Sequence, residues 1–379
     1  MIDILEIRDR SLKLIGVIDN ATSIIWVTEY YGAGHLEIYA PMTDNTIAML
    51  KKGNYVVRRD EVQAAIIEAV SYKESAESGM MIIARGRMLK SILDRRLAYK
   101  LKDSHHIKPV RVTGYVRNVQ NVVRDQAGTL AGTARIIPGL IIGSNGGITK
   151  KIETDTELEG ESSRQSSYKN LLTFTDSILQ EYECGALMRL SITETDKSLV
   201  YDLYEGKDRT VNNTDGNKPV IFSQNFDNLL SATLDTDETF YKNYALIGGE
   251  GEGENRFFAE FKEAEATGLD RRETFVNALD IPKTYTDDQE QEQTYTDDEY
   301  TALLVGQAQT ELKELVTTEK MEAELNLIYS PFKLREDFSL GDKVTIQDNR
   351  LDLYMNVRIL KITEVQDANG YMASLEYGN

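Results

Sequence analysis

The stretch from Val220 to Asp280 carries the most informative pattern in this chain. It runs through VIFSQNFDNLL at 220–230, ETFYKNYALIGGEGEGENR at 238–256 and GLDRRETFVNALDI at 268–281. Residues 219–247 predict strands, and GGEGEG at 248–253 predicts a flexible turn after them. The spacing of these glycines matches neither a dinucleotide fingerprint nor a Walker loop, and the two glutamates would repel phosphate. The stretch therefore predicts β-structure without a phosphate site.

Length and composition indicate a soluble, globular chain of two or three domains. The chain has 379 residues, of which 41% are hydrophobic and 28% are charged, so it can bury a sizeable core. No apolar run approaches the roughly 18 residues of a membrane span, and the polar start MIDILEIRDR lacks the regions of a signal peptide. We expect no membrane span and no export signal of these kinds.

Few side chains are suited to cofactor or metal chemistry. Cys184 is the single cysteine, which excludes an intrachain disulfide and a cysteine-based zinc cage. No basic cluster adjoins it to activate the thiol, so we expect a small buried hydrophobic residue. The histidines are His35, His105 and His106. The adjacent pair would point to opposite sides of a strand, which favours packing over a metal site.

No catalytic signature is recognisable in the sequence. The three histidines cannot form HExxH, and GESSR at 160–164 breaks the nucleophile-elbow pattern after the serine. The 62 acidic residues are too numerous for any two to be chosen as a glycosidase pair. We predict no catalytic, cofactor-binding or metal-binding residue and no cofactor. Arg95-Arg96 and Arg271-Arg272 are interpreted as ion-pair partners between chains or domains rather than as anion sites.

The net charge of −19 bears on the partners of the chain. Broad, nonspecific binding of a phosphate backbone requires clustered Lys and Arg, which release counterions on binding. An acidic wall repels DNA instead. The charge therefore suits a conduit that DNA passes better than a surface that holds it.

The first third of the chain predicts β-structure. Short β-branched or aromatic runs at 12–18, 24–30 and 36–40 are separated by turn residues, and NYVVRRD, AAIIEAVSYKE and GMMIIARGR follow them. Several strands at this spacing suggest a small barrel or sandwich. After Gly86 the apolar spacing becomes helical, so RMLKSILDRRL at 87–97 predicts a short amphipathic helix.

The middle of the chain is less regular. VTGYVRNVQNVV at 112–123 fits a strand or a helix, and the glycine-punctuated segment 129–147 fits a buried loop or a contact surface for another chain. Ser166 or Ser167 offers the cap of a helix whose apolar stripe ends before Gly185. Two strands, ALMRLSIT and SLVYDLYEG, follow with the polar turn ETDK between them.

Residues 284–324 form an acidic segment with twelve Asp or Glu against two Lys, a net charge of −10. The element TYTDD occurs in it twice, at 284–288 and at 294–298. The acids lack the EF-hand order with its central glycine, so we predict a mobile acidic loop and not a calcium site. From Asp297 onward the leucine spacing predicts a solvated helix.

The last 55 residues return to strands. A turn at Leu340-Gly341-Asp342 precedes the strand KVTIQD, and LYMNVRILKITEVQD with ANGYMASLEYG predicts a closing hairpin. The β-rich segments therefore lie in 1–102 and again in the second half. There, 218–250 and 325–379 can close one barrel around an intervening insertion.

Several blocks of the sequence resemble the hub proteins at the tail tip of long-tailed phages and prophages, the family that includes the N-terminal structural part of tail-associated lysins. In the first third the blocks are YGAGHLEIYAP, LKKGNYVVRRD with AAIIEAV, and ARGRMLKSILDRRLAY. In the middle they are YEGKDRT, the VIFSQNFDNLL run, NYALIGGEGEGENR and DRRETFVNALDI, and at the end FSLGDKVTI and the closing strand pair. Each block is weak alone, but in this order they span nearly the whole chain.

This resemblance implies an α+β, predominantly β fold with two small antiparallel β-barrels and an α/β insertion, assembled as a homotrimeric ring. Three chains then present six barrels to the hexameric tail tube, although no internal sequence repeat is visible between the two barrels. We expect a first barrel at 1–104 and a second at 218–250 and 325–379. The central α+β insertion with its acidic loop then occupies 105–217 and 251–324.

In function, the resemblance implies a structural virion protein, made in the bacterial host cytoplasm, that caps the tail tube and opens for DNA ejection. Its implied partners are a distal tail ring protein, a tail tube or tape-measure protein, and receptor-binding or tail-fibre proteins. Relatives with a peptidase or cell-wall hydrolase carry it in a C-terminal extension, and this chain stops where the extension would begin. Flexible-tailed phages and contractile particles both need such a hub.

Two other classes of function are alternatives to the hub. A cell-envelope polysaccharide or peptidoglycan hydrolase requires a carboxylate pair hidden in the middle region. A glycan-binding tail adhesin requires exposed aromatic side chains among the 20 tyrosines. Self-assembly into a ring favours the hub over both.

Overall fold

In the computed structural model, the chain folds into two compact units. Among the described residues, unit 1 lies within Met1–Ile152, Ser163–Thr233 and Met321–Asn379, and unit 2 lies within Leu234–Lys320. The structure describes residues 2, 4–75, 79–102, 105–152, 163–166, 169–193, 196–263, 265–279, 281–286, 291–312, 315–325, 330–348 and 353–378.

The N-terminal part of unit 1 consists of antiparallel strands and a short helix. In chain order these are β1 (Leu5–Arg8), β2 (Leu14–Ile18), β3 (Ser23–Glu29), β4 (His35–Pro41), α1 (Asp44–Met49), β5 (Tyr55–Arg58), β6 (Ala65–Ser75) and β7 (Gly79–Met88). The six predicted runs between residues 12 and 87 are confirmed as strands. The helix predicted at 87–97 is present as a 3-10 helix, η1 (Leu89–Arg95).

The C-terminal part of unit 1 supplies the remaining strands of the same sheet. These are β15 (Ile221–Ser223), β16 (Leu229–Asp237), β22 (Thr318–Leu325), β23 (Lys343–Asp348), β24 (Leu353–Asp367) and β25 (Gly370–Gly378). KVTIQD forms β23 after the predicted turn, and the last two strands form the predicted hairpin.

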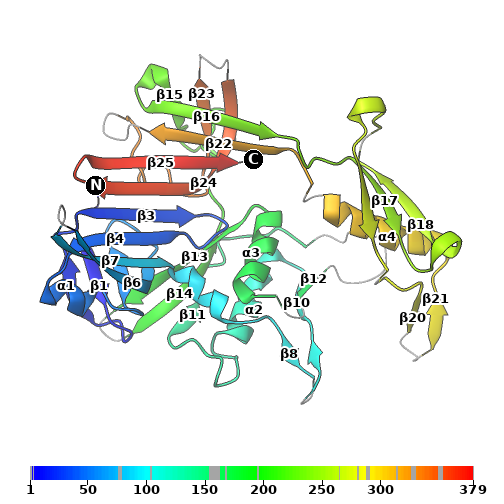
Figure 1. The fold of residues 1–379 in the computed structure, drawn as a ribbon, viewed down its shortest axis with the longest axis horizontal. Coiled ribbons are helices and arrows are strands. Elements are labelled where there is room, and N and C mark those ends of the chain that lie inside the picture. The colour runs from blue at the N-terminus through cyan, green and yellow to red at the C-terminus, as the bar shows by residue number, and fades with distance from the viewer. Residues whose placement is uncertain are drawn as a thin grey trace. The chain divides into compact units, whose positions relative to one another are not determined.

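All of these strands join one 13-stranded sheet. Its main path runs β16-β22-β25-β24-β3-β4-β7-β6-β5-β1-β2, and β23 pairs with β24 and with β15. The antiparallel pair of β24 with β3, from Lys361↔Glu29 to Gln366↔Ile24, joins the two parts (Figure 1). Two separate barrels are expected from the sequence, whereas the described strands close none, because hydrogen bonds between β3 and β24 join the two strand sets into one open sheet.

The N-terminal half of the sheet curls around a core of its own. Every strand from β1 to β7 contributes to one buried cluster, which includes Leu5, Ile18, Trp26, Ile38, Val56, Ile67 and Ile82. In β1 and β4 buried residues alternate with more exposed ones, as expected of strands with one buried face, whereas β3 and β7 contain runs of consecutive buried residues. The curled sheet therefore has a barrel-like interior without a closed ring of hydrogen bonds among the described residues.

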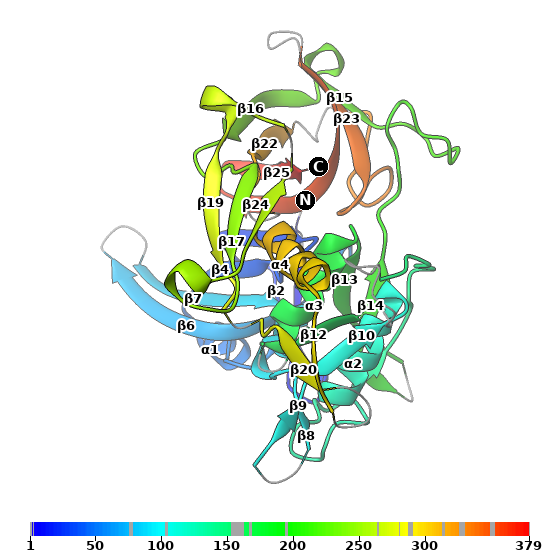
Figure 2. The same ribbon diagram turned by 90° about the vertical axis from the view of Figure 1, so that its right-hand side faces the viewer.

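A layer of helices and short strands packs on this sheet (Figure 2). It contains β8 (Lys100–Leu101), β9 (Ile107–Lys108), β10 (Val110–Thr113), η2 (Val116–Asn118), α2 (Val119–Gln126), β11 (Leu140–Ile142), β12 (Ser163–Ser166), α3 (Leu171–Glu181), β13 (Gly185–Ile192) and β14 (Lys197–Tyr204). Its core joins Tyr55 and Ile66 of the sheet to apolar side chains of η1, α2, α3, β13 and β14.

The structure resolves the irregular middle segments of the sequence. The ambiguous run 112–123 is divided between β10, η2 and α2. Segment 129–147 contributes β11, which pairs in parallel with β14. The predicted cap of α3 was wrong: Ser166 belongs to β12, Ser167 lies outside the described residues, and Asn170 caps the helix by accepting hydrogen bonds from the backbone N–H groups of residues 172 and 173.

Unit 2 is a small α+β structure. It contains β17 (Tyr244–Gly248), η4 (Gly253–Asn255), β18 (Phe258–Lys262), η5 (Gly268–Asp270), β19 (Glu273–Asn277), β20 (Thr284–Thr286), β21 (Glu292–Thr294) and α4 (Asp297–Leu312). The sheet order is β18-β17-β19, and α4 packs on one face over a core of Ala245, Ile247, Val276, Tyr300, Leu304 and Ala308. The helix predicted from Asp297 onward is confirmed.

The two TYTDD elements lie face to face. Thr284 pairs with Thr294 across the β20–β21 hairpin, and the rings of Tyr285 and Tyr295 stack with centroids 4.4 Å apart. In the second element Thr296 also caps α4, because its hydroxyl accepts from the backbone N–H of Glu299, whose carboxylate accepts from the N–H of Thr296. Residues 287–290 of the predicted acidic loop lie outside the described residues.

The tight contact between β6 and β7 generates a prediction for Gly86→Ala. A Cβ at Gly86 would lie 1.9 Å from the carbonyl oxygen of Ile66, so the two strands must separate. We expect the free energy of unfolding, measured by urea denaturation, to fall by about 1 to 3 kcal/mol. The control is Gly132→Ala, whose Cβ would meet nothing within 4 Å and should change stability by less than about 0.5 kcal/mol. Equal effects would contradict the close packing.

Candidate functional site

A buried ion-pair cluster lies where the two strand sets of unit 1 meet. Glu364 of β24 accepts hydrogen bonds from Arg58 of β5 at 2.9 and 3.1 Å and from the hydroxyl of Tyr371 at 2.7 Å. Arg335, in the loop before β23, also donates to the Glu364 carboxylate and bonds Glu61 at 2.7 Å. The side chains of Arg58 and Glu364 are each 1% exposed. This cluster connects three segments that are far apart in sequence.

The Arg58–Glu364 ion pair also shows that the sheet is strongly curled. Five strand spacings separate β24 from β5 along the sheet, which in a flat sheet would place them roughly 24 Å apart. An arginine side chain cannot span that distance, so the inner face of the curl must bring Arg58 over β24. Arg58 also stacks on Trp26 of β3, with its guanidinium carbon 5.2 Å from the ring centroid.

Two neighbouring arginines keep the Glu364 carboxyl negatively charged. Burial alone would raise the pKa of this carboxyl, but the hydrogen bonds and positive charges of Arg335 and Arg58 outweigh burial and hold the pKa at about 2.

Arg335 adopts a left-handed backbone conformation, with φ of 71°, which is uncommon for a residue with a side chain. The loop holds this conformation through a hydrogen bond from the N–H of Arg335 to the carbonyl of Phe338 at 2.7 Å.

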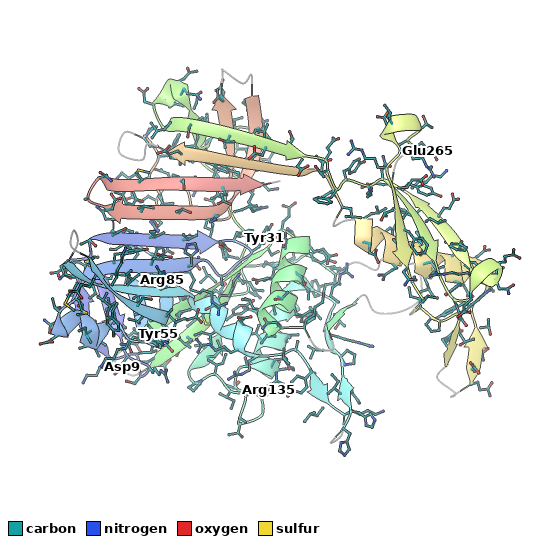
Figure 3. All side chains as sticks on the ribbon, in the orientation of Figure 1. Asp9, Tyr31, Tyr55, Arg85, Arg135 and Glu265 are labelled. Atoms are coloured by element: carbon teal, nitrogen blue, oxygen red, sulfur yellow. The ribbon has the colours of Figure 1, made fainter. Side chains whose placement is uncertain are left out.

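Tyr30 is buried at the same junction, next to the helical layer. Its fully buried ring lies at the end of β3 and packs on Tyr204 and on Tyr31, which is labelled in Figure 3. Arg358 of β24 lies over the Tyr30 ring and binds Glu183 at 2.8 Å. Gly341, in the predicted turn, has φ of 90°, and a Cβ there would lie 2.4 Å from the Tyr30 ring. The turn therefore requires glycine for both reasons.

A cavity of about 640 Å³ opens beside the cluster. Its lining includes Asp60, Glu61, Arg209, Arg335 and Asp342. These charges are paired with one another or with the cluster, since Arg335 binds Glu61 and Arg209 binds Asp342 at 2.9 Å. The cavity thus presents bonded charges, which are suited to holding segments together.

The described carboxyl groups offer little for acid catalysis. A general acid needs a raised pKa, and among the described carboxyls with a resolved shift only Asp176 has one. Burial raises the pKa of Asp176, while Lys90 at 3.1 Å opposes this. The pair joins α3 to η1 and does not line the cavity. The described residues contain no group of three or more His, Cys, Asp or Glu placed to hold a metal.

The residues singled out in the sequence are dispersed. Cys184 is fully buried, and burial raises the pKa of its thiol to about 12, which agrees with the predicted buried hydrophobic residue. His35, on β4, and His105 and His106, before β9, are exposed. Residues 160–162 of GESSR lie outside the described residues.

Arg95, Arg271 and Arg272 make ion pairs inside single units, and a role between chains stays a prediction. Arg95 binds Glu68 at 3.3 Å, whereas Arg96 donates to the carbonyl of Arg135 at 2.6 Å. In unit 2, Arg271 binds Glu273 and Arg272 binds Glu238.

GGEGEG forms the predicted turn after a strand, between β17 and β18. The N–H of Glu250 donates to the Tyr300 hydroxyl at 2.8 Å, and the Glu250 carboxylate accepts from the N–H of Lys283 at 2.7 Å. This glutamate thereby secures the turn against α4 and the chain before β20.

The fold of the chain is similar to that of two solved tail proteins. One solved structure with this fold is the tail protein from Neisseria meningitidis MC58, with a TM-score of 0.57 and 12% identity over 100% of this chain and 97% of that chain. Another is the 43 kDa tail protein of prophage MuSo2 from Shewanella oneidensis, with a TM-score of 0.56 and 10% identity over 100% and 98%. At these identities the likeness shows the fold alone.

Residues 4–379 match the family described as Siphovirus ReqiPepy6 Gp37-like protein. The chain therefore belongs to this family of phage tail proteins, and the resemblance found in the sequence is confirmed. No curated protein sequence matches the chain. Within the part of the chain that the structure describes, no helix is both long and apolar enough to cross a membrane.

The Glu364 cluster predicts acid sensitivity. Because the pKa of Glu364 falls from 4.5 to about 2 on folding, its contribution to stability is complete above pH 4.5 and is lost as the pH falls from 4.5 to 2. Glu364→Gln should lower the free energy of unfolding at pH 7 by about 2 to 3 kcal/mol, because Arg58 and Arg335 each lose one carboxylate partner and keep only Asp60 and Glu61, respectively. It should also flatten the decline in stability between pH 4.5 and 2, as measured by urea denaturation.

The matched control is Glu376→Gln in β25. Glu376 pairs with Lys361 at 2.6 Å, but both side chains are partly exposed, so this substitution should cost less than about 1 kcal/mol. Equal losses from the two variants, or an unchanged pH profile for Glu364→Gln, would show that the buried cluster does not stabilise the junction.

Proposed function

We propose that this phage tail protein is a subunit of the tail hub, a homotrimeric ring at the distal end of the tail. In this role it caps the tail tube, connects it to the receptor-binding apparatus and opens for DNA ejection. The family assignment supports a structural role in the tail. The observation that carries the proposal further is the open sheet of unit 1, which ends in two different edge strands.

One edge strand has the composition of an association surface. β2, with the sequence LIGVI, ends the described sheet on one side and exposes the side chains of Leu14, Ile15 and Val17. Edge strands of proteins that stay monomeric are usually protected by charges, proline or bulges. β2 carries no charged residue and no proline, so its backbone and aliphatic side chains are suited to pairing with another chain.

The opposite end of the path is β16, which exposes Leu230. Contacts between two different edges of identical chains are heterologous, and they close into a ring when the rotation between subunits permits. Three chains would contribute six curled strand sets, two from each chain. The domain boundaries 1–104, 218–250 with 325–379, and 105–217 with 251–324 belong to this proposal, with open strand sets in place of closed barrels.

Charge and partners fit the same role. The net charge of −19 repels the phosphate backbone, so DNA can pass through the ring without being held. The ring would contact a distal tail ring protein, the tail tube or tape-measure protein, and receptor-binding or tail-fibre proteins. The protein would be made in the bacterial cytoplasm and act at the tail tip of the virion.

The hub accounts for the junction better than the two alternatives do. A hydrolase needs a carboxyl with a raised pKa facing a substrate, whereas the cavity is lined by carboxylates such as Glu61 and Asp342 that bind arginines. An adhesin needs exposed aromatic residues. Three exposed tyrosines, Tyr72, Tyr285 and Tyr354, lie on three different strands, β6, β20 and β24, so glycan binding by the purified protein is the test that separates an adhesin from the hub.

The mass in solution tests the hub. Three chains of 42.8 kDa make 3 × 42.8 = 128.4 kDa, and light scattering of the purified protein should give this value. The double variant Ile15→Lys/Val17→Lys should shift the mass toward the monomer, because lysine on an edge strand opposes pairing. Leu130→Lys, which alters an exposed leucine outside the strands, should leave the trimer intact.

A monomer at all concentrations would overturn the self-assembling ring. An intact trimer in the β2 variant would reject this edge as the contact. Cleavage of peptidoglycan or binding of host glycan by the purified protein would favour the hydrolase or the adhesin.

A further inference from the structure

The sheet of unit 2 has one covered face and one open face. α4 covers the face that carries Ala245, Ile247, Ala259 and Val276. Because side chains alternate along a strand, the next residues in each strand lie on the opposite face. The register places them in rows. The rows are Phe258 with Gly248 and Asn277, Glu260 with Leu246 and Phe275, and Lys262 with Tyr244 and Glu273.

The open face carries two exposed aromatic rings and a leucine, with the exposed Glu260 in the same row as Leu246 and Phe275. Phe258 is 48% exposed, Phe275 50% and Leu246 36%, and they come from three neighbouring strands. Figure 2 shows β17 and β19 side by side. Scattered exposed hydrophobic residues need no explanation, but adjacent ones on a regular face mark interaction sites. We call Leu246, Phe258 and Phe275, together with Arg256, the aromatic face.

Arg256 is held rigidly among these side chains. Its guanidinium donates to the carbonyls of Gly248 at 2.8 Å and Gly249 at 3.1 Å. The guanidinium carbon also lies 5.9 Å from the ring of Phe258 and 5.4 Å from that of Phe275. Aromatic residues and arginine are enriched among the residues that dominate binding energy. Because the Arg256 side chain is already fixed in the free protein, binding a partner would cost little of its conformational entropy.

The charge around the aromatic face selects the kind of partner. Residues 234–320 hold 22 Asp or Glu against 8 Lys or Arg, a net of −14 out of −19 for the whole chain. Glu252 and Glu254 are exposed in the turn that leads to Phe258. This charge repels nucleic acid, anionic lipid and a second copy of the same unit. A protein whose apolar contact is rimmed by Lys or Arg is complementary to it.

We propose that the aromatic face of unit 2 is the docking surface for a different protein of the tail particle, one that presents an apolar patch surrounded by Lys and Arg. Phe258, Phe275 and Leu246 bury against the apolar patch, and the acids of unit 2 pair with the basic rim. The residues involved all lie in unit 2 and outside the proposed ring contacts of β2 and β16. Docking therefore does not depend on the trimeric ring.

Photocross-linking in assembled particles tests this surface. The full chain is supplied to particles with p-benzoylphenylalanine at Phe258 or at Phe275, and with the same residue at Leu130 of unit 1 as a control. We expect both unit 2 positions to cross-link to one other tail protein, at a peptide that contains Lys or Arg, and the Leu130 position not to do so. Cross-links to a second copy of this chain, to a peptide without basic residues, or from neither position would overturn the proposal.

Binding of the cross-linked protein to the purified full chain supplies an independent measurement. Phe275→Ala should weaken the Kd roughly 30-fold, as expected of a residue that dominates an interface. Phe240→Ala, which removes a 71% exposed ring outside the aromatic face, should change it less than threefold. Higher salt should slow association, because charge steers the encounter. Equal effects of the two substitutions, or association insensitive to salt, would overturn the assignment of this face.

Discussion

The constraint on which unit 1 depends is the burial of one carboxylate, Glu364, in the strand that joins its two strand sets. A charge in that position is costly unless opposite charges and hydrogen bonds surround it. Arg58 and Arg335 supply them, one from the N-terminal half and one from the loop before β23. The need to pair this charge therefore brings together β24, the end of β5 and the loop. The cavity and the Tyr30 contacts lie around that meeting point.

Strand periodicity was enough to find most elements, but not their pairing. The runs that became β2 to β7 are short, mostly β-branched or aromatic, and separated by turn residues, and the leucine spacing after Asp297 marked α4. No pattern in the sequence of β24 or of β3 shows that these two strands pair with each other. Separate barrels were therefore expected where one sheet exists. The cluster could have been suspected from Glu364, which follows Ile362 by two positions and so occupies the buried register of its strand. Its partners could not be found, because nothing in the sequence shows that Arg58 lies opposite it.

The two units divide the surface properties of the chain. Unit 1 keeps its charges paired at the junction and ends in an uncharged aliphatic edge, which suits contact with identical neighbours. Unit 2 concentrates negative charge around an aromatic centre, which suits contact with something unlike itself. Placing the two kinds of surface on separate units allows one to change its partner in evolution while the other keeps its geometry.

The pairing of β3 with β24 also has a consequence for how the chain folds as it is made. Arg58 and Glu364 are 306 residues apart, and at roughly 5 to 20 residues per second a ribosome needs roughly 15 to 60 s to synthesise that interval. During this time Arg58 has Asp60 as a carboxylate partner but lacks Glu364, and the edge of β3 that later pairs with β24 has no partner. A nascent chain with an open strand edge is exposed to pairing with its neighbours on the same messenger. The subunits would therefore be most vulnerable to premature association before their last strands emerge.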